Sequence, residues 1–269
     1  YRIDFILKMI NKNFKKILFS FALIMCNFLL LTCSNDNTSI IMVAASLNEV
    51  IQEEYEKSDN NDKFYISYGG SMSLARRVEN NEKKIGAVIL ASNSSMEILI
   101  NKDLLKNSEI GLFAKNSLVL ATSNNSYTYE TFIKDNKLDN EKKIIIADPE
   151  IAPAGSYSKQ VLENIFHVRD IDNKIISTGD VSYVSSMLVS NDKYYGILYK
   201  TEAIKNNLFI IHEFPNTFHD DIEYKTGVLS QNNNTYINNF IDRLNSPTVK
   251  KKLSELGFEV QKWTIWKSS

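Results

Sequence analysis

The sequence predicts an α/β fold built from helices packed on mainly parallel sheets. Short apolar runs that alternate with amphipathic helical segments predict this class, and the 43% of hydrophobic residues among the 269 supports an ordinary core. Beyond an N-terminal leader, about 235 residues remain, which is enough for two lobes or one large domain. We therefore expect a body with an ordinary apolar core.

The N-terminal region has the layout of a secretory signal peptide. A basic segment opens at Met9, the expected start of translation, an almost uncharged apolar run (17–31) follows, and then Cys33. We expect residues 1–33 to be the leader, with Cys33 lipidated after cleavage. Thr32 departs from the Gly, Ala or Ser usual before a lipoprotein Cys, so an uncleaved membrane anchor stays the alternative.

Strands and helices alternate through the first half of the body and again through the second. Apolar runs predict strands at 39–45, 64–68, 87–90, 118–122, 144–147, 174–177, 195–199, 208–214 and 224–229. Amphipathic spacing predicts helices at 47–57, 73–80, 95–105, 129–134, 156–166, 182–190, 235–244 and 247–255. This order predicts strands covered by helices on both faces.

Composition excludes several classes of function. The two cysteines lie in the leader, so the body has no disulfide or Cys-based metal site. A net charge of -1 argues against a nucleic-acid partner. The three histidines (His167, His212 and His219) lie in no catalytic or metal motif, and we interpret His219 as part of a solvated loop. We expect no enzyme and no cofactor.

The most informative stretch runs from Ile144 to Lys159. Its apolar strand ends at Asp148-Pro149, a second break follows at Pro153-Ala154-Gly155, and a helix then begins. The start of a helix leaves backbone N–H groups that either bind an anion or are capped by the chain. Asp148 and Glu150 are expected to cap the turn.

Three further junctions have the same small, polar composition, at 44–47, 69–73 and 178–182. Helix capping alone would explain any one of them. Four in one α/β chain favour a shared polar cleft at the carboxyl ends of the strands.

From about Ile41 to the C-terminus the chain resembles the molybdate-binding proteins of ABC transporters, a branch of the two-lobed periplasmic-binding-protein fold. The matching motifs include Ala44-Ala45-Ser46-Leu47, Tyr68-Gly69-Gly70-Ser71, Asp148-Pro149-Glu150 with Pro153-Ala154-Gly155-Ser156-Tyr157, and Gly196-Ile197-Leu198-Tyr199. Three departures are Ile85-Gly86-Ala87, where an Ala-Asp pair usually leads into the third strand, Met72, where a small residue is usual, and Lys225, where a Pro is usual after the tyrosine.

The resemblance implies an oxyanion site without a cation. Ser46 and Ser71 would donate hydroxyl and backbone N–H groups, Ala154 and Val181 backbone N–H groups, and Tyr199 its phenol. Neutral dipoles and helix N-termini can hold a tetrahedral dianion. For Tyr199, a tyrosine that caps the core at a strand end is the alternative.

The resemblance also implies the organisation and the partners. We expect one lobe at 39–117 plus 228–269 and another at 118–227, joined by crossovers near 118–122 and 224–227. The expected function is a monomeric lipoprotein on the periplasmic or extracellular face of the membrane. It would pass molybdate or tungstate to an ABC transporter permease. Alternatives are a protein for sulfate or phosphate, or a surface sensor or adhesin of the same fold.

Overall fold

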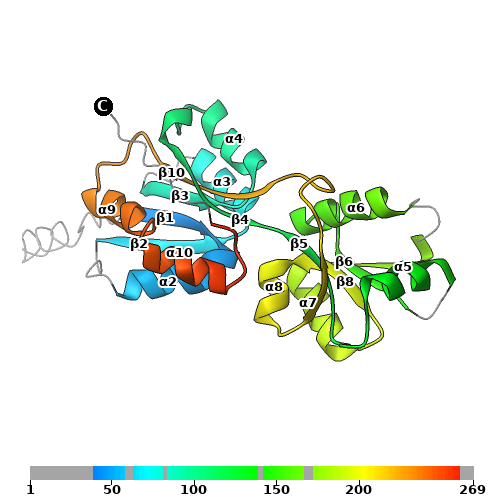
Figure 1. The fold of residues 1–269 in the computed structure, drawn as a ribbon. Helices are drawn as coiled ribbons and strands as arrows, with labels where there is room; N and C mark the ends of the chain where they lie inside the picture. The colour runs from blue at the N-terminus through cyan, green and yellow to red at the C-terminus, as the bar shows by residue number, and fades with distance from the viewer. Residues whose placement is uncertain (1–38, 58–62, 81–83, 139–141, 167–171, 261–269) are drawn as a thin grey trace, which may run out of the picture. The chain divides into compact units, whose positions relative to one another are not determined.

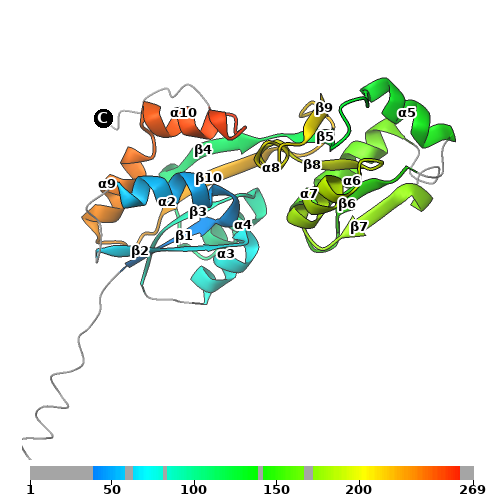
Figure 2. The same ribbon diagram turned by 90° about the horizontal axis from the view of Figure 1, so that it is seen from below.

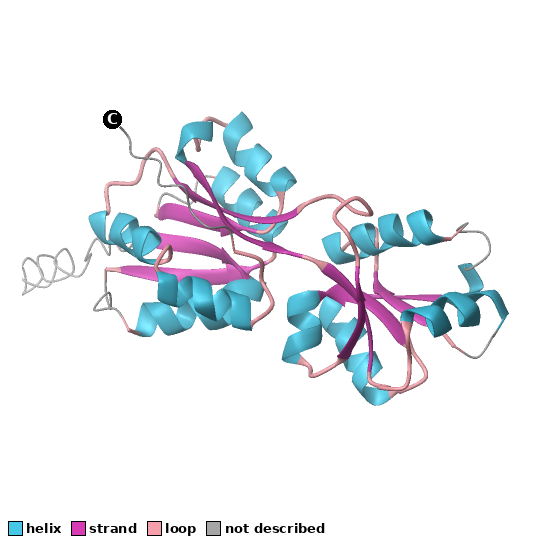
Figure 3. Ribbon diagram, in the orientation of Figure 1, coloured by secondary structure: helices cyan, strands magenta, loops and turns pink. Residues whose placement is uncertain are grey.

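A computed structural model describes residues 39–57, 63–80, 84–138, 142–166 and 172–260 (Figure 1). They form two five-stranded sheets with helices on both faces (Figure 3), which confirms the predicted fold class. The expected leader and Cys33 lie outside the described residues. Within the described ranges, no helix has the length and apolarity needed to cross a membrane.

The first sheet has the strand order β2-β1-β3-β10-β4. Its strands are β1 (Ser39–Ala44), β2 (Phe64–Gly69), β3 (Ile85–Leu90), β4 (Ile110–Asn116) and β10 (Ile222–Val228). Strand β1 pairs parallel with β2 and β3, whereas β10 pairs antiparallel with β3 and β4. The sheet is therefore mixed, with its parallel strands on one side. We call this sheet and its helices the first lobe.

Helices cover both faces of the first sheet. They are η1 (Ala45–Leu47), α2 (Asn48–Glu56), α3 (Ser71–Glu79), α4 (Asn93–Asn101), η2 (Asn107–Glu109), α9 (Thr235–Arg243) and α10 (Pro247–Glu255). Ile41 and Val43 of β1 belong to the core formed with α2, α9 and α10, and Met42 to the core formed with α3 and α4. Successive side chains of a strand point to opposite faces, which explains this sorting.

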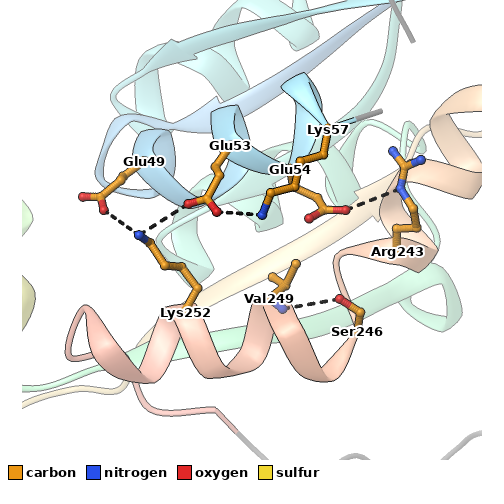
Figure 4. A network of polar contacts seen from close by, with 8 residues as sticks. All are labelled: Glu49, Glu53, Glu54, Lys57, Arg243, Ser246, Val249 and Lys252. Atoms are coloured by element: carbon orange, nitrogen blue, oxygen red, sulfur yellow. Dashed lines mark hydrogen bonds and ion pairs between the residues drawn. The ribbon is translucent and has the colours of Figure 1, made fainter. Parts of the chain in front are cut away.

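Charged side chains also join α2 to α10 (Figure 4). Lys252 Nζ lies 3.1 Å from Glu49 Oε1 and 3.4 Å from Glu53 Oε2. These side chains are solvent-accessible, so the ion pairs contribute little to stability. The apolar contacts beneath them hold the two helices.

The second sheet has the order β7-β6-β8-β5-β9. Its strands are β5 (Leu118–Thr122), β6 (Ile144–Ala147), β7 (Ile175–Thr178), β8 (Tyr195–Tyr199) and β9 (Phe209–Glu213). Its helices are α5 (Tyr129–Leu138), α6 (Pro153–Ile165), η4 (Asp172–Lys174), α7 (Val181–Ser190) and α8 (Lys200–Lys205) (Figure 2). Strand β6 pairs parallel with β7 and β8, and β5 antiparallel with β8 and β9, as in the first sheet. We call this sheet and its helices the second lobe.

Two connections run between the sheets, and hydrogen bonds hold the first of them to the second lobe. Ser117 links β4 to β5, and residues 214–221 link β9 to β10. The Ser117 hydroxyl donates to Glu213 Oε1 over 2.6 Å, and Asn116 Nδ2 donates to Thr201 Oγ1 over 3.0 Å. These bonds tie the first connection to the end of β9 and to the start of α8.

The structure differs from the expected elements in three respects. Strand β4 and helix α8 were not expected, because Gly111 interrupts the apolar run of β4 and α8 is a single short helix. Helices α3, α4, α6 and α7 begin one to three residues earlier than expected, and α4 ends at Asn101 rather than at Leu105. Strand β10, expected mostly in the second lobe, pairs with the first sheet. The lobe boundaries themselves stay a prediction.

Candidate functional site

The five candidate residues all lie where a parallel strand ends and a helix begins. In the first lobe, Ser46 lies in η1 after β1, and Ser71 is the first residue of α3 after β2. In the second lobe, Ala154 is the second residue of α6 after β6, and Val181 is the first residue of α7 after β7. Tyr199 is the last residue of β8. The carboxyl ends of strands are where open α/β sheets bind ligands.

Ser71 presents a fixed hydroxyl. Its Oγ accepts a hydrogen bond of 2.8 Å from the backbone N–H of Ala91, just after β3. A hydroxyl that accepts in this way keeps its own hydrogen for another acceptor. Gly70, the N-cap residue of α3, supplies no side-chain cap, so the start of this helix is not covered by its own chain.

Ser46 is held by a tyrosine that we did not predict at the site. Its Oγ lies 3.0 Å from the hydroxyl of Tyr224 in β10, and Tyr224 is 1% exposed. Burial raises the pKa of the Tyr224 phenol, against hydrogen bonds with Ser46 and Asn116 that lower it, so the phenol stays protonated at neutral pH. The pair is 178 residues apart in sequence. In the sequence, the only indication of a role for Tyr224 was its position before Lys225 in the expected second crossover.

Ala154 presents a backbone N–H at the start of α6. The N-cap Ala152 has no capping side chain, and its carbonyl accepts the N–H groups of Gly155 and Ser156, at 2.9 and 3.3 Å. Within the described residues, the Ala154 N–H has no hydrogen-bond partner. It is therefore available to a ligand.

Gly155 allows α6 to approach the end of β6 closely. A Cβ atom at this position would lie 2.3 Å from the carbonyl oxygen of Ala147 and 2.5 Å from the carbonyl carbon of Asp148. Real Cβ contacts are never that short, so only glycine fits without a backbone shift. The position of the Ala154 N–H depends on this glycine.

The start of α7 differs, because a carboxylate caps it. Asp180 Oδ1 accepts the N–H groups of Ser182 and Tyr183, at 2.9 and 3.3 Å. The side-chain hydrogen bond from Ser182 is the main cause that lowers the pKa of Asp180. The N–H of Val181 is left without a partner among the described residues. The ionised carboxylate of Asp180 lies close to this N–H and repels an anion. We had not predicted Asp180 as the cap of α7.

Tyr199 is protonated at neutral pH and can donate. Burial raises the pKa of its phenol well above the usual 10.0, and the nearby tyrosines Tyr224 and Tyr157 raise it further. Tyr224 thus pairs with Ser46 of the first lobe and raises the pKa of Tyr199 in the second. Across the described part of the chain, no hydrogen bond joins any two of the five candidates directly.

Two further expectations have different outcomes. Asp148 caps its turn as predicted, since its Oδ1 accepts the N–H of Glu150 over 2.8 Å. The solvated loop expected at His219 is wrong: this imidazole is 6% exposed and packs near Tyr157 of α6. In the described ranges, no three His, Cys, Asp or Glu side chains are grouped to hold a metal ion.

A cavity of about 570 Å³ adjoins Ser46 but does not include the other four candidates. Four acidic residues and one lysine are among those that line it: Glu49, Glu53, Glu56, Glu202 and Lys205. Carboxylates repel an anion, so this cavity does not suit an oxyanion. The helix starts are the better candidate.

Known proteins resemble this chain over nearly all of its described length. The family model of bacterial extracellular solute-binding proteins matches residues 40–259. The molybdate-binding protein ModA of Escherichia coli is 24% identical, over 82% of this chain and 88% of that protein. The protein YvgL of Bacillus subtilis is 24% identical, over 92% of this chain and 100% of YvgL. It is provisionally named as an ABC transporter substrate-binding lipoprotein.

A solved structure gives the same result for the fold. It is a substrate-binding domain assigned to a molybdenum ABC transporter from Clostridium difficile, with 28% sequence identity and a TM-score of 0.72. The match covers 84% of this chain and 99% of that domain. The two-lobed architecture expected from the sequence is thereby confirmed.

Proposed function

Because this chain belongs to the family of bacterial extracellular solute-binding proteins, we propose that it captures molybdate or tungstate outside the cytoplasm. An ABC transporter permease then receives the anion. The names of two relatives support this choice of ligand, since one binds molybdate and the other is assigned to a molybdenum transporter. The family is one of transport proteins and not a class of enzymes.

The observation that carries the proposal is a set of neutral donors at helix starts. The Ser71 hydroxyl is oriented by Ala91, the N–H groups of Ala154 and Val181 have no described partner, and Tyr199 keeps its proton. Neutral donors of fixed geometry select an anion by its size, and they suit a large tetrahedral dianion away from water.

Donors from both lobes would bind one anion. Ser46 and Ser71 belong to the first lobe, Ala154 and Val181 to the second, and Tyr199 stands where β8 meets the inter-sheet connection. The expected boundaries, 39–117 with 228–269 and 118–227, stay part of the proposal, and the pairing of β10 with the first sheet favours counting residues 222–227 with the first lobe. Closure around the anion removes water, which strengthens each hydrogen bond.

Lipid attachment at Cys33 is part of the proposal. The similarity to a B. subtilis lipoprotein supports it. Cells that express the full chain would be labelled with a lipid precursor. We expect label on the wild type and on Cys26→Ala, and none on Cys33→Ala. Equal label on both variants would leave Cys33 without this role.

Calorimetric titration with molybdate, tungstate, sulfate and phosphate tests the ligand. We expect molybdate and tungstate to bind at least about a hundredfold more tightly than sulfate, a difference of about 2.7 kcal/mol. Stronger binding of sulfate or phosphate would replace the proposed ligand. No heat with any of the four would favour a sensor or adhesin of the same fold.

A further inference from the structure

Three large apolar side chains lie in solvent beside the candidate donors. Met72 is 38% exposed, Ile151 72% and Tyr183 61%. Met72 follows Ser71 in the first turn of α3. Ile151 precedes α6 in the loop that leads to Ala154, and Tyr183 lies in the first turn of α7, two residues after Val181. Three of the five helix starts that carry a candidate donor thus have one exposed apolar residue.

Both second-lobe residues are held in place by the fold. The loop of Ile151 is fixed by Asp148, whose carbonyl accepts the N–H of Ala152 over 2.9 Å and whose own N–H donates to the Thr178 carbonyl over 2.6 Å. The ring of Tyr183 lies back toward the helix start, since a Cβ atom placed on Gly179 would be 3.5 Å from two of its ring atoms. Neither side chain is exposed simply because its loop is irregular.

The geometry points to Met72, Ile151 and Tyr183 as an apolar rim that covers the bound anion. This inference rests on the proposed function. A dianion held by neutral donors binds tightly only where water is excluded, because water competes for the same donors. The rim supplies apolar surface from both lobes at the edge of the site, and closure buries it.

We expect the rim residues of each lobe to pack against the opposite lobe of the same molecule. The three side chains accompany donors that would share one anion, so any movement that brings the donors together also brings the rim residues together. Val189 is a useful contrast: it is 59% exposed on the same helix as Tyr183, but at the end remote from Val181.

The test uses the full exported chain and calorimetric titration with sodium molybdate at several temperatures. The rim variant carries Met72→Gln, Ile151→Thr and Tyr183→Gln, and Val189→Thr is the matched control. All four side chains are exposed, so folding should be unaffected, which the melting temperature checks. We expect the rim variant to bind molybdate at least about tenfold more weakly than the control. We also expect a less negative heat-capacity change, because less apolar surface is buried on binding.

The outcomes distinguish failure of the rim inference from failure of the proposed function. If the wild type binds molybdate and the rim variant matches the control in affinity and heat-capacity change, the rim is overturned and the function stands. If the wild type binds no oxyanion, both are overturned. If the rim substitutions change only self-association in sedimentation experiments, the surface serves contact with a second copy and the inference is wrong.

Discussion

The first lobe offers its candidate donors mainly as side-chain hydroxyls, whereas the second lobe offers two of its three as backbone N–H groups. The strand orders β2-β1-β3-β10-β4 and β7-β6-β8-β5-β9 are equivalent, so the architecture does not cause the difference. In the first lobe, Ser71 is positioned by a hydrogen bond from Ala91. In the second, the N–H of Ala154 is positioned by the close packing of Gly155. One kind of donor is removed by changing its own side chain, and the other only by moving the backbone.

Gly155→Ala should give the largest effect. The new Cβ would lie 2.3 Å from the Ala147 carbonyl, so α6 must shift. We expect the free energy of unfolding to fall by about 1–3 kcal/mol. Molybdate affinity should fall roughly a hundredfold, because a hydrogen bond to a charged group contributes about 1.5–3 kcal/mol. Thermal unfolding and calorimetry measure the two effects.

Gly70→Ala, at a first-lobe junction, is the control for stability. Its Cβ would meet nothing within 4 Å. The loss of stability should therefore stay within about 1 kcal/mol, the usual range for an N-cap change. Equal destabilisation by the two substitutions would contradict the special role of Gly155.

Ser71→Ala tests the first lobe directly. The change deletes a donor and leaves the N–H of Ala91 without its partner. We expect molybdate affinity to fall by about 1–3 kcal/mol, or roughly ten- to a hundredfold. Ser73→Ala, on an exposed residue of the same helix, should bind as the wild type does. An unchanged affinity for Ser71→Ala would remove this hydroxyl from the site.

Two tyrosine substitutions separate a donor from its support. Tyr199→Phe deletes the phenol proposed to contact the anion, and an affinity loss of about tenfold is expected. Tyr224→Phe removes the partner of Ser46, 3.0 Å away, and the hydrogen bond with Asn116, but no proposed contact to the anion, so a loss of a few fold is expected. If Tyr224→Phe were the more damaging change in calorimetry, Tyr224 rather than Tyr199 would be the direct contact.

Asp180→Asn should strengthen binding slightly. Asn remains a good N-cap residue but carries no charge, so α7 keeps its cap while the repulsion of an anion disappears. We expect roughly two- to fourfold tighter binding at low salt, with a smaller difference at high salt. Asp192→Asn, just beyond the other end of α7, should have no effect. Weaker binding by Asp180→Asn would contradict an anion at this helix start.

The sequence predicted most of the strands because their apolar runs are short and end at clear breaks. The strands Leu118–Thr122 and Tyr195–Tyr199 have the expected bounds. Helix starts were less exact. Pro153 was interpreted as a break before α6, yet proline fits the first position of a helix, where its missing N–H is not needed. Local sequence does not distinguish these two uses of proline.

The contacts within the site were not predictable from local sequence. Ser46 and Tyr224 meet only because β10 returns to the first sheet, beside β3 and β4. The burial of His219 likewise depends on packing against α6. Local sequence favoured a solvated loop there, because the hydrophilic Asp220 and Asp221 follow this histidine. The sequence predicts which residues are the donors, and tertiary structure shows what holds those residues in place.

A crystal structure of the tungstate complex would test the central claim most directly, because anomalous scattering from tungsten locates the anion without assumptions. The account predicts one tungsten position, with oxyanion contacts to the Ser46 and Ser71 hydroxyls, the Ala154 and Val181 N–H groups and the Tyr199 phenol, and with Met72, Ile151 and Tyr183 buried around it. A tungsten site elsewhere, or one held by lysine or arginine side chains, would contradict it.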